Sequence, residues 1–189
     1  GDQDKKTPLS ELGGKGVFIK TLEVALLEKK IDIAIHSLKD VTAELENGLE
    51  LSSFLEPEAI EDCMILHPKY KEKTLESLPE NAKIGTGSLR RKALIKQTIP
   101  NSTCVDIRGN VQTRIDKLES ENLDAILLSY CGLIRLGLKE KAAIILAPDE
   151  FIPAPGQGVI ALETRQGDDL SMQVSRSINS TSQEKISRL

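Results

Sequence analysis

The chain has 189 residues, enough for one large domain or two small domains with separate hydrophobic cores. Hydrophobic residues make up 39% and charged residues 29%, which is typical of soluble globular proteins, and no apolar run is long enough to span a bilayer. A net charge of −4 and an aromatic content of 3% without Trp argue against a general nucleic-acid-binding protein.

The three cysteines, Cys63, Cys104 and Cys131, lie far apart in the sequence and form no C-x-x-C pair. Neither a disulfide framework nor a zinc site is therefore indicated, and we expect no metal. The chain begins with "GDQDKK", without Met, and shows no signal-peptide pattern. We expect a reducing, cytoplasmic setting.

The first part of the chain predicts a loop, a helix and two strands. Residues 1–14 are polar and indicate a loop, and a helical stripe begins at Lys15. "IDIAI" (31–35) predicts a strand buried on both faces of a parallel sheet, and "LELSSFL" (49–55) predicts another strand. The following stretch contains Pro57, Pro68 and Pro79 and indicates a crossover between domains.

From Lys83 onward, short strands alternate with helices, a pattern that predicts an α/β fold. The expected strands are "AKIG" (82–85), "CVDI" (104–107), "DAILLS" (124–129) and "VIALET" (159–164). Ser88 and Asn110 are expected to cap helices that run to about Gln97 and through 111–121, and "GLIRLGL" (132–138) predicts a short helix.

A helix is expected near 168–178, and Thr181 with Glu184 predicts a capping box that opens another helix. The sequence stops within that helix, so we expect the chain to be a fragment.

Three polar clusters follow predicted strands: "HSLKD" (36–40), "GTGSLRR" (85–91) and "RGNVQTR" (108–114). In parallel α/β sheets, ligands bind at the carboxyl ends of strands, and helix N-termini there favour anions. Residues 85–114 contain six Lys or Arg and one acid, Asp106, a net charge of +5. Guanidinium groups pair bidentately with carboxylates, so this stretch predicts a site for a polycarboxylate. The alternative is a solvated basic helix face.

Two other motifs are less informative. "HSLKD" is weak by itself, since His36 is as consistent with a structural hydrogen bond as with proton transfer. Lys39 and Asp40 gain interest from their position at the end of a predicted strand. "GGKG" (13–16) suggests a P-loop but fails that motif, because Gly16 replaces the required Ser or Thr.

Five segments together resemble the porphobilinogen deaminase family, in order and spacing. They are "GGKGVFIKTLEVALLEKKIDIAIHSLKDV", "IGTGSLRRKALI", "DIRGNVQTRIDKL", "LDAILLSYCGLIRLGL" and "PAPGQGVIALETR". The resemblance covers essentially the whole chain. It implies a transferase of tetrapyrrole (heme and porphyrin) biosynthesis that joins four porphobilinogen molecules head to tail, with release of ammonia, to give linear hydroxymethylbilane.

The resemblance also implies an architecture. The family has two lobes like type II periplasmic binding proteins, with mixed, mostly parallel sheets, a two-segment hinge and the active site in the cleft between them. Here domain 1 is expected at 1–55 and 152–189, without its N-terminal strand, and domain 2 at 56–151. The family's third, α+β domain is absent from these 189 residues.

The resemblance assigns roles to site residues. Asp40 matches the catalytic aspartate, and Lys39 is expected to pair with a cofactor carboxylate. Gly13, Gly14, Lys15 and Gly16 belong to a mobile active-site loop. The remaining cofactor- and substrate-binding residues are expected to be Thr86, Ser88, Arg90, Arg91, Arg108, Gly109, Arg114 and Arg135.

Some features depart from the family. Its dipyrromethane cofactor is attached to a cysteine in a Gly-Gly-Cys context of the third domain, and no such context occurs here. The 189 residues alone are therefore expected to be inactive. "GTGS" replaces the more usual "GTSS", and "DVT" replaces "DVP".

The main alternative function is a two-lobed module that binds or senses an anionic solute without catalysis. Asp40 discriminates, because a carboxylate disfavours anion binding but stabilises a developing cation. An RNA-binding module is a second alternative. We expect a monomer with a small-molecule substrate and with neither nucleic acid nor membrane as a partner.

Overall fold

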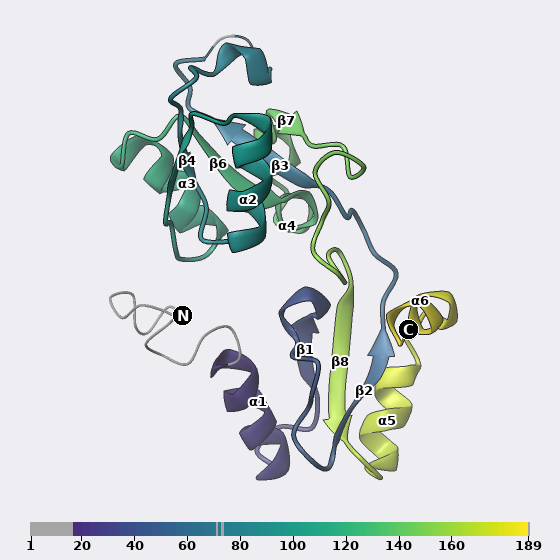
Figure 1. The fold of residues 1–189 in the computed structure, drawn as a ribbon. Helices are drawn as coiled ribbons and strands as arrows, with labels where there is room; N and C mark the ends of the chain where they lie inside the picture. Colours follow the sequence, from purple (N-terminus) through teal and green to yellow (C-terminus); the bar gives the residue numbers. More distant parts are fainter. Residues whose placement is uncertain (1–16, 71, 73, 189) are drawn as a thin grey trace. The chain divides into compact units, whose positions relative to one another are not determined.

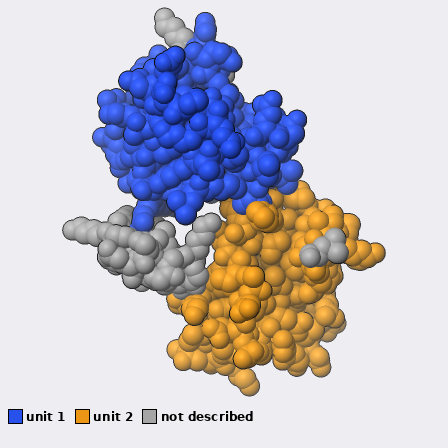
Figure 2. Space-filling view, viewed as in Figure 1, with its two compact units in different colours: residues 1–5, 59–154 blue, residues 6–58, 155–189 orange. Residues whose placement is uncertain are grey.

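The computed structural model describes residues 17–70, 72 and 74–188. It divides the chain into two units (Figure 1, Figure 2). Of the described residues, those in 59–154 lie in unit 1 and those in 17–58 and 155–188 lie in unit 2, so this part of the chain passes between the units twice. The expected active-site loop, with Gly13, Gly14, Lys15 and Gly16, lies outside the described residues.

Unit 1 contains a five-stranded mixed sheet with the strand order β5-β4-β6-β3-β7. Strand β4 runs parallel to β5 and β6, whereas β3 runs antiparallel to β6 and β7. The strands are β3 (Asp62–Leu66), β4 (Lys83–Gly85), β5 (Thr103–Val105), β6 (Ala125–Ser129) and β7 (Ile144–Ile145). The helices are α2 (Leu89–Thr98), α3 (Val111–Ser120) and α4 (Tyr130–Arg135), with short 3-10 turns at Leu75–Ser77 and Lys139–Lys141.

Helices cover both faces of this sheet. Successive residues of a strand point to opposite faces, so each central strand packs against helices on both sides. Met64 of β3 and Leu127 of β6 pack on one face with Ile95 of α2. Their neighbours Cys63 and Leu128 pack on the other face with residues of α3 and α4, including Leu118 and Leu133. Unit 1 is therefore a three-layer α/β structure (Figure 1).

Unit 2 contains a three-stranded sheet with the order β1-β8-β2, in which β8 runs antiparallel to both neighbours. The strands are β1 (Ala34–Ser37), β2 (Leu49–Phe54) and β8 (Ile160–Arg165), and the helices are α1 (Val17–Leu27), α5 (Asp169–Arg176) and α6 (Thr181–Ser187). Leu26 of α1 packs on Ala34 and Leu49, while Ser175 of α5 hydrogen-bonds Ser52 and Ser53 of β2.

The α/β class and the mixed sheets are confirmed, but the expectation of mostly parallel sheets is wrong. Of the six strand pairings among the described residues, four are antiparallel and two parallel. The antiparallel pairs in unit 2 arise because β1 and β2 flank β8, a strand from the far end of the chain. The strand predicted at 31–35 begins at Ala34, and it is not buried on both faces, since Ile35 is 67% exposed.

Two other expectations need correction. The stretch interpreted as a crossover does contain the passage between the units, after Glu58, but it also contains strand β3, whose five residues are all buried. The cap of α6 is Ser180, whose hydroxyl accepts from the backbone N–H of Gln183 at 3.1 Å, and not Thr181. Glu184 instead binds Asn179 and Arg188.

Among residues 17–188, with gaps at 71 and 73, no helix has the length and apolar character needed to cross a membrane.

The core position of β3 predicts the order in which the cysteines react. Cys63 has no exposed surface and burial raises the pKa of its thiol to about 12, so it remains a protonated, poorly nucleophilic thiol at neutral pH. Cys131 is also buried, whereas Cys104 is half-buried, although burial raises its pKa as well. We expect an aromatic disulfide reagent to label Cys104 first and Cys63 at least about tenfold more slowly.

Peptide mass analysis of partly labelled protein identifies the modified cysteine, and denatured protein serves as the control in which all three react. Labelling of Cys63 as fast as Cys104 would contradict the burial of β3.

Candidate functional site: an arginine-rich sheet edge and a Lys-Asp turn

One edge of the unit 1 sheet gathers the ends of four strands. Strands β4, β5 and β6 are parallel, so their carboxyl ends share an edge, and each leads into a helix. Ser88 caps α2 and Asn110 caps α3, so the first N–H groups of both helices point to this edge. Strand β3 is antiparallel to β6 and begins here, because Asp62 lies opposite Ser129.

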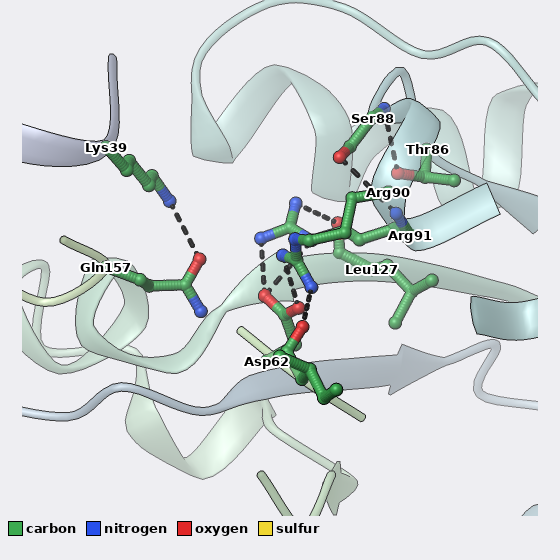
Figure 3. A network of polar contacts seen from close by, with 9 residues as sticks. Lys39, Asp62, Thr86, Ser88, Arg90, Arg91, Leu127 and Gln157 are labelled. Atoms are coloured by element: carbon green, nitrogen blue, oxygen red, sulfur yellow. Dashed lines mark hydrogen bonds and ion pairs between the residues drawn. The ribbon is translucent and has the colours of Figure 1, made fainter. Parts of the chain in front are cut away.

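Asp62 is the buried acid of this edge, and it binds both arginines of the first turn of α2 (Figure 3). Its carboxylate has no exposed surface. Oδ2 lies 2.7 Å from Nη2 of Arg90, while Oδ1 accepts from Nη2 and Nε of Arg91 at 2.7 and 3.1 Å. Arg91 also donates to the carbonyl of Leu127 at 3.3 Å, and Arg90 to that of Ile152 at 2.5 Å.

Through these contacts, Arg90 and Arg91, which were predicted to bind an external carboxylate, bind groups of the protein itself. Arg91 is 7% exposed, and the Arg90 side chain is 25% exposed. One carboxylate faces two guanidinium groups, which leaves one positive charge in excess. Nε of Arg90 is buried and has no hydrogen-bond partner in the described part of the chain. Binding of an external carboxylate by Arg90 or Arg91 therefore stays a prediction, whereas their bonds to Asp62 are observed.

The hydroxyl groups of Thr86 and Ser88 shape the turn between β4 and α2. Thr86 is buried, and its Oγ1 accepts from the backbone N–H of Ser88 at 3.3 Å. Ser88 Oγ accepts from the backbone N–H of Arg91 at 3.5 Å. A Cβ atom at Gly87 would lie 3.2 Å from the carbonyl oxygen of Ile107, so the β4–α2 turn passes close to the segment after β5.

The turn between β5 and α3 contains Arg108 and Gly109, and Gly109 binds Arg114 of α3. Gly109 has φ +108°, and a Cβ atom there would lie 2.6 Å from Cγ2 of Thr113. Asn110 Oδ1 accepts from the backbone N–H of Thr113 at 2.8 Å. Arg114, one helical turn later, donates from Nε to the carbonyl of Gly109 at 2.7 Å. Arg108 lies half-buried just after β5.

The structure places the remaining cations of unit 1 differently. Arg135 is exposed at the end of α4. Nζ of Lys92 pairs with Asp106 at 2.8 Å. Asp106 is itself largely exposed, so this ion pair lies at the surface.

In unit 2, Lys39 and Asp40 lie on a 3-10 turn (Leu38–Asp40) that directly follows β1. Nζ of Lys39 donates to Oε1 of Gln157 at 3.3 Å (Figure 3), and Gln157 is buried. Asp40 is exposed, so its carboxylate is accessible to a substrate. His36 is the structural hydrogen-bonder of this motif, because its Nε2 lies 2.8 Å from Oε2 of buried Glu163.

Three polar partners were not predicted from the sequence: Asp62, Gln157 and Glu163. Asp62 had a usable signal, since it directly precedes the apolar run "CMIL". In the described residues, no group of three or more His, Cys, Asp or Glu side chains could hold a metal ion.

The arrangement supports two chemical tasks. The edge of unit 1 offers guanidinium groups, hydroxyl groups and helix N-termini, which suit several carboxylates. The turn of unit 2 offers an ammonium group beside an accessible carboxylate, and a carboxylate stabilises a cation formed during reaction.

Comparison with solved structures defines the fold class. A periplasmic substrate-binding protein of an ABC transporter from Coxiella burnetii matches with a TM-score of 0.53 and 13% identity, over 86% of this chain and 77% of that one. A double-mutant VFT2 domain of BvgS from Bordetella pertussis matches with a TM-score of 0.50 and 15% identity, over 90% and 71%. At these identities the likeness shows the fold alone: two lobes like those of periplasmic binding proteins.

Sequence comparison identifies the family. The family profile described as "Porphobilinogen deaminase, dipyromethane cofactor binding domain" matches residues 1–173. The porphobilinogen deaminase of Deinococcus radiodurans is 44% identical over 181 residues, which are 95% of this chain and 58% of that protein. The chain belongs to the porphobilinogen deaminase family. It spans less than two thirds of the length of this relative.

The buried ion pairs predict that Asp62 is essential for the stability of unit 1. Asp62→Ala should lower the free energy of unfolding by about 3–5 kcal/mol, because it leaves two arginines without their buried counter-charge. The matched control is Asp106→Asn, which removes the surface partner of Lys92 and should cost less than about 1 kcal/mol. Urea unfolding monitored by circular dichroism gives both values, and equal losses would refute the central role of Asp62.

The turn at Gly109 predicts a second stability difference. Gly109→Ala should cost about 1–3 kcal/mol, because the methyl group would overlap Thr113 and φ is positive. Gly137 has φ +68° but nothing within 4 Å of an added Cβ, so Gly137→Ala should cost about 1 kcal/mol or less. Thermal unfolding compares the two variants. If Gly137→Ala were the more harmful change, the steric account of the β5–α3 turn would fail.

Proposed function

We propose that this chain forms the cofactor- and substrate-binding part of a porphobilinogen deaminase (hydroxymethylbilane synthase). The reaction condenses four porphobilinogen molecules stepwise, head to tail, and releases ammonia at each step to give linear hydroxymethylbilane. The observation that carries the proposal is the accessible carboxylate of Asp40 beside Lys39, in a chain of this family whose unit 1 carries an arginine-rich sheet edge.

We assign the catalytic role to Asp40. When the C–N bond of the protonated porphobilinogen aminomethyl group breaks, the bonding electrons stay with the nitrogen, which leaves as ammonia, and the pyrrole becomes an azafulvenium cation. A carboxylate close to this cation stabilises its charge and accepts a hydrogen bond from the pyrrole N–H. The free pyrrole carbon of the partner unit then attacks the cation, forms the new C–C bond and loses its proton.

The donor set fits the carboxylates of the substrate and of a dipyrromethane cofactor. Each pyrrole ring carries an acetate and a propionate, so two rings present four carboxylates. In unit 1, the residues that we propose to hold them are Arg108, Arg114 and Arg135, with Arg90, Arg91, Thr86, Ser88 and Gly109 forming the edge around these three. In unit 2, we propose the same role for Lys39. The bound cofactor supplies the pyrrole chain on which substrate units are added.

The cysteines of this chain do not fit covalent attachment of that cofactor. Cys63 and Cys131 are buried, and burial raises the pKa of the Cys63 and Cys104 thiols, whereas attachment requires an accessible thiol. We therefore place the attachment residue outside these 189 residues.

The rival function, binding or sensing of an anionic solute without catalysis, is not favoured by the family match. Asp40 also argues against it, because an accessible acid weakens binding of an anion. We further propose that the protein acts in the cytoplasm as a monomer and requires neither nucleic acid nor a membrane.

The direct test supplies porphobilinogen to the full-length protein and measures ammonia and hydroxymethylbilane together. We expect about four ammonia molecules for each linear product, as the proposed stoichiometry requires. Saturable binding of porphobilinogen without ammonia release would instead support the solute-binding function.

The role of Asp40 predicts a large loss of turnover without a loss of structure. Asp40→Ala in the full-length protein should lower kcat on the order of a hundredfold or more, the scale of losing one electrostatic stabiliser of a transition state. Because Asp40 is exposed, the unfolding midpoint should change little. Glu44→Gln removes another exposed carboxylate of the same loop and serves as the control. Near-normal turnover of Asp40→Ala would disprove the assignment.

The roles of Arg108 and Arg114 predict a block in chain elongation. Replacing either residue by Leu should remove a carboxylate partner and lead to accumulation of shorter enzyme-bound intermediates. Lys92→Leu is the control, since it removes a cation of the same stretch that pairs with Asp106 at the surface. Native mass spectrometry resolves the intermediates. Equal effects of all three substitutions would mean that residues 85–114 act only as a generic charged face.

A further inference from the structure

We propose that the buried pair His36–Glu163 is a positioning element that fixes the register of β1 on β8 and thereby holds the Lys39–Asp40 turn. The catalytic consequence rests on the proposed function, whereas the structural consequence can be measured without it. Neither residue needs to touch substrate, because both act through the turn.

The pair lies within the β1–β8 ladder, on one face of the sheet. His36 is opposite Ala161, and Glu163 is opposite Ala34, so the two side chains form a diagonal cross-strand pair. Their polar atoms are 2.8 Å apart. His36 is 6% exposed and Glu163 has no exposed surface, so water does not compete for this contact.

Strand β1 has little else to define its register. It contains four residues with alternating burial, and its buried face consists of Ala34 and His36 alone. The other face carries Ile35 and Ser37, which are exposed. The pairing register of a strand is strongly specified where a row of apolar side chains must face a core. In β1 the only apolar side chain on the buried face is Ala34, whose small side chain specifies the register weakly. A hydrogen bond between buried polar groups supplies the missing specification, as buried polar residues do in some other folds.

The pair is not explained by stability alone. A buried, hydrogen-bonded ionisable pair contributes little net stability compared with well-packed apolar side chains. Oε1 of Glu163 is, moreover, buried without a hydrogen-bond partner in the described residues, which is unfavourable. Apolar residues at these two positions could make the protein more stable than the His36–Glu163 pair does. The presence of the pair is therefore better explained by a role in specifying one geometry of β1.

The register of β1 determines where the turn lies. Directly after the strand, the backbone N–H of Leu38 donates to the carbonyl of Val159 at 3.0 Å, and that of Val41 donates to Leu38 at 3.0 Å. The Leu38 side chain packs so closely on Gly156 that a Cβ atom there would lie 2.8 Å from its Cγ. A shift of β1 along β8 would break these contacts and move Lys39 away from Gln157.

The inference is tested by measuring hydrogen exchange of individual backbone amides by NMR in the unaltered protein and in three variants. Glu163→Leu removes the acceptor, Glu163→Gln keeps one, and Ser175→Ala is the matched control. Ser175→Ala removes buried hydrogen bonds to Ser52 and Ser53 on β2, at the opposite edge of the same sheet.

We expect Glu163→Leu to lower the protection of the Leu38 and Val41 amides about tenfold or more, with Glu163→Gln restoring most of it. Ser175→Ala should lower the unfolding midpoint without selective loss at these two amides. Unchanged protection in Glu163→Leu, or the same selective loss in Ser175→Ala, overturns the inference. If Glu163→Leu does not fold, His36→Asn, whose shorter amide cannot reach Glu163, replaces it with the same criteria.

Steady-state kinetics provide a second measurement, because a purely structural role of the pair would not lower kcat selectively. In the full-length protein, Glu163→Leu should lower kcat while the KM for porphobilinogen changes less, because the carboxylates remain bound by unit 1. If even the unaltered protein is inactive, the proposed function fails, while the exchange data still decide the positioning role.

Discussion

The arrangement of the unit 1 edge depends on one buried carboxylate. Asp62 lies at the start of β3 with no exposed surface and compensates the charges of Arg90 and Arg91 in the first turn of α2. Without that acid, two guanidinium groups could not be held between the helix and the sheet. The pair of bonds fixes the orientation of α2, whose N-terminus forms part of the edge. The excess positive charge that remains suits an anionic ligand.

The two units divide the chemistry between them. Unit 1 concentrates positive charge where three parallel strands end and helices begin, an arrangement that suits the binding of carboxylates. Unit 2 presents a single accessible carboxylate on a short turn, and the role that we propose for it is to stabilise a cation. Both tasks are needed for a reaction in which a polyanionic chain grows through cationic intermediates. This division explains how an acidic chain comes to contain a stretch with a net charge of +5.

Sequence reasoning located the elements that local signals define. Ser88 and Asn110 do cap α2 and α3, and the apolar run of β6 is a buried strand, because caps and apolar runs are local features. Strand pairing was not local: β8 separates β1 from β2, although it lies over a hundred residues away in sequence. The partners of Arg90 and His36 were missed for the same reason. Asp62 precedes the apolar run of β3 and Glu163 lies within β8, and the neighbouring sequence does not show which cation each of them faces.

The most direct test of the functional account is the intact mass of the full-length protein after denaturing purification. We expect a covalent mass gain equal to a dipyrromethane with its four carboxylates, carried on a cysteine other than Cys63, Cys104 and Cys131. An unmodified mass in protein that also releases no ammonia from porphobilinogen would contradict it.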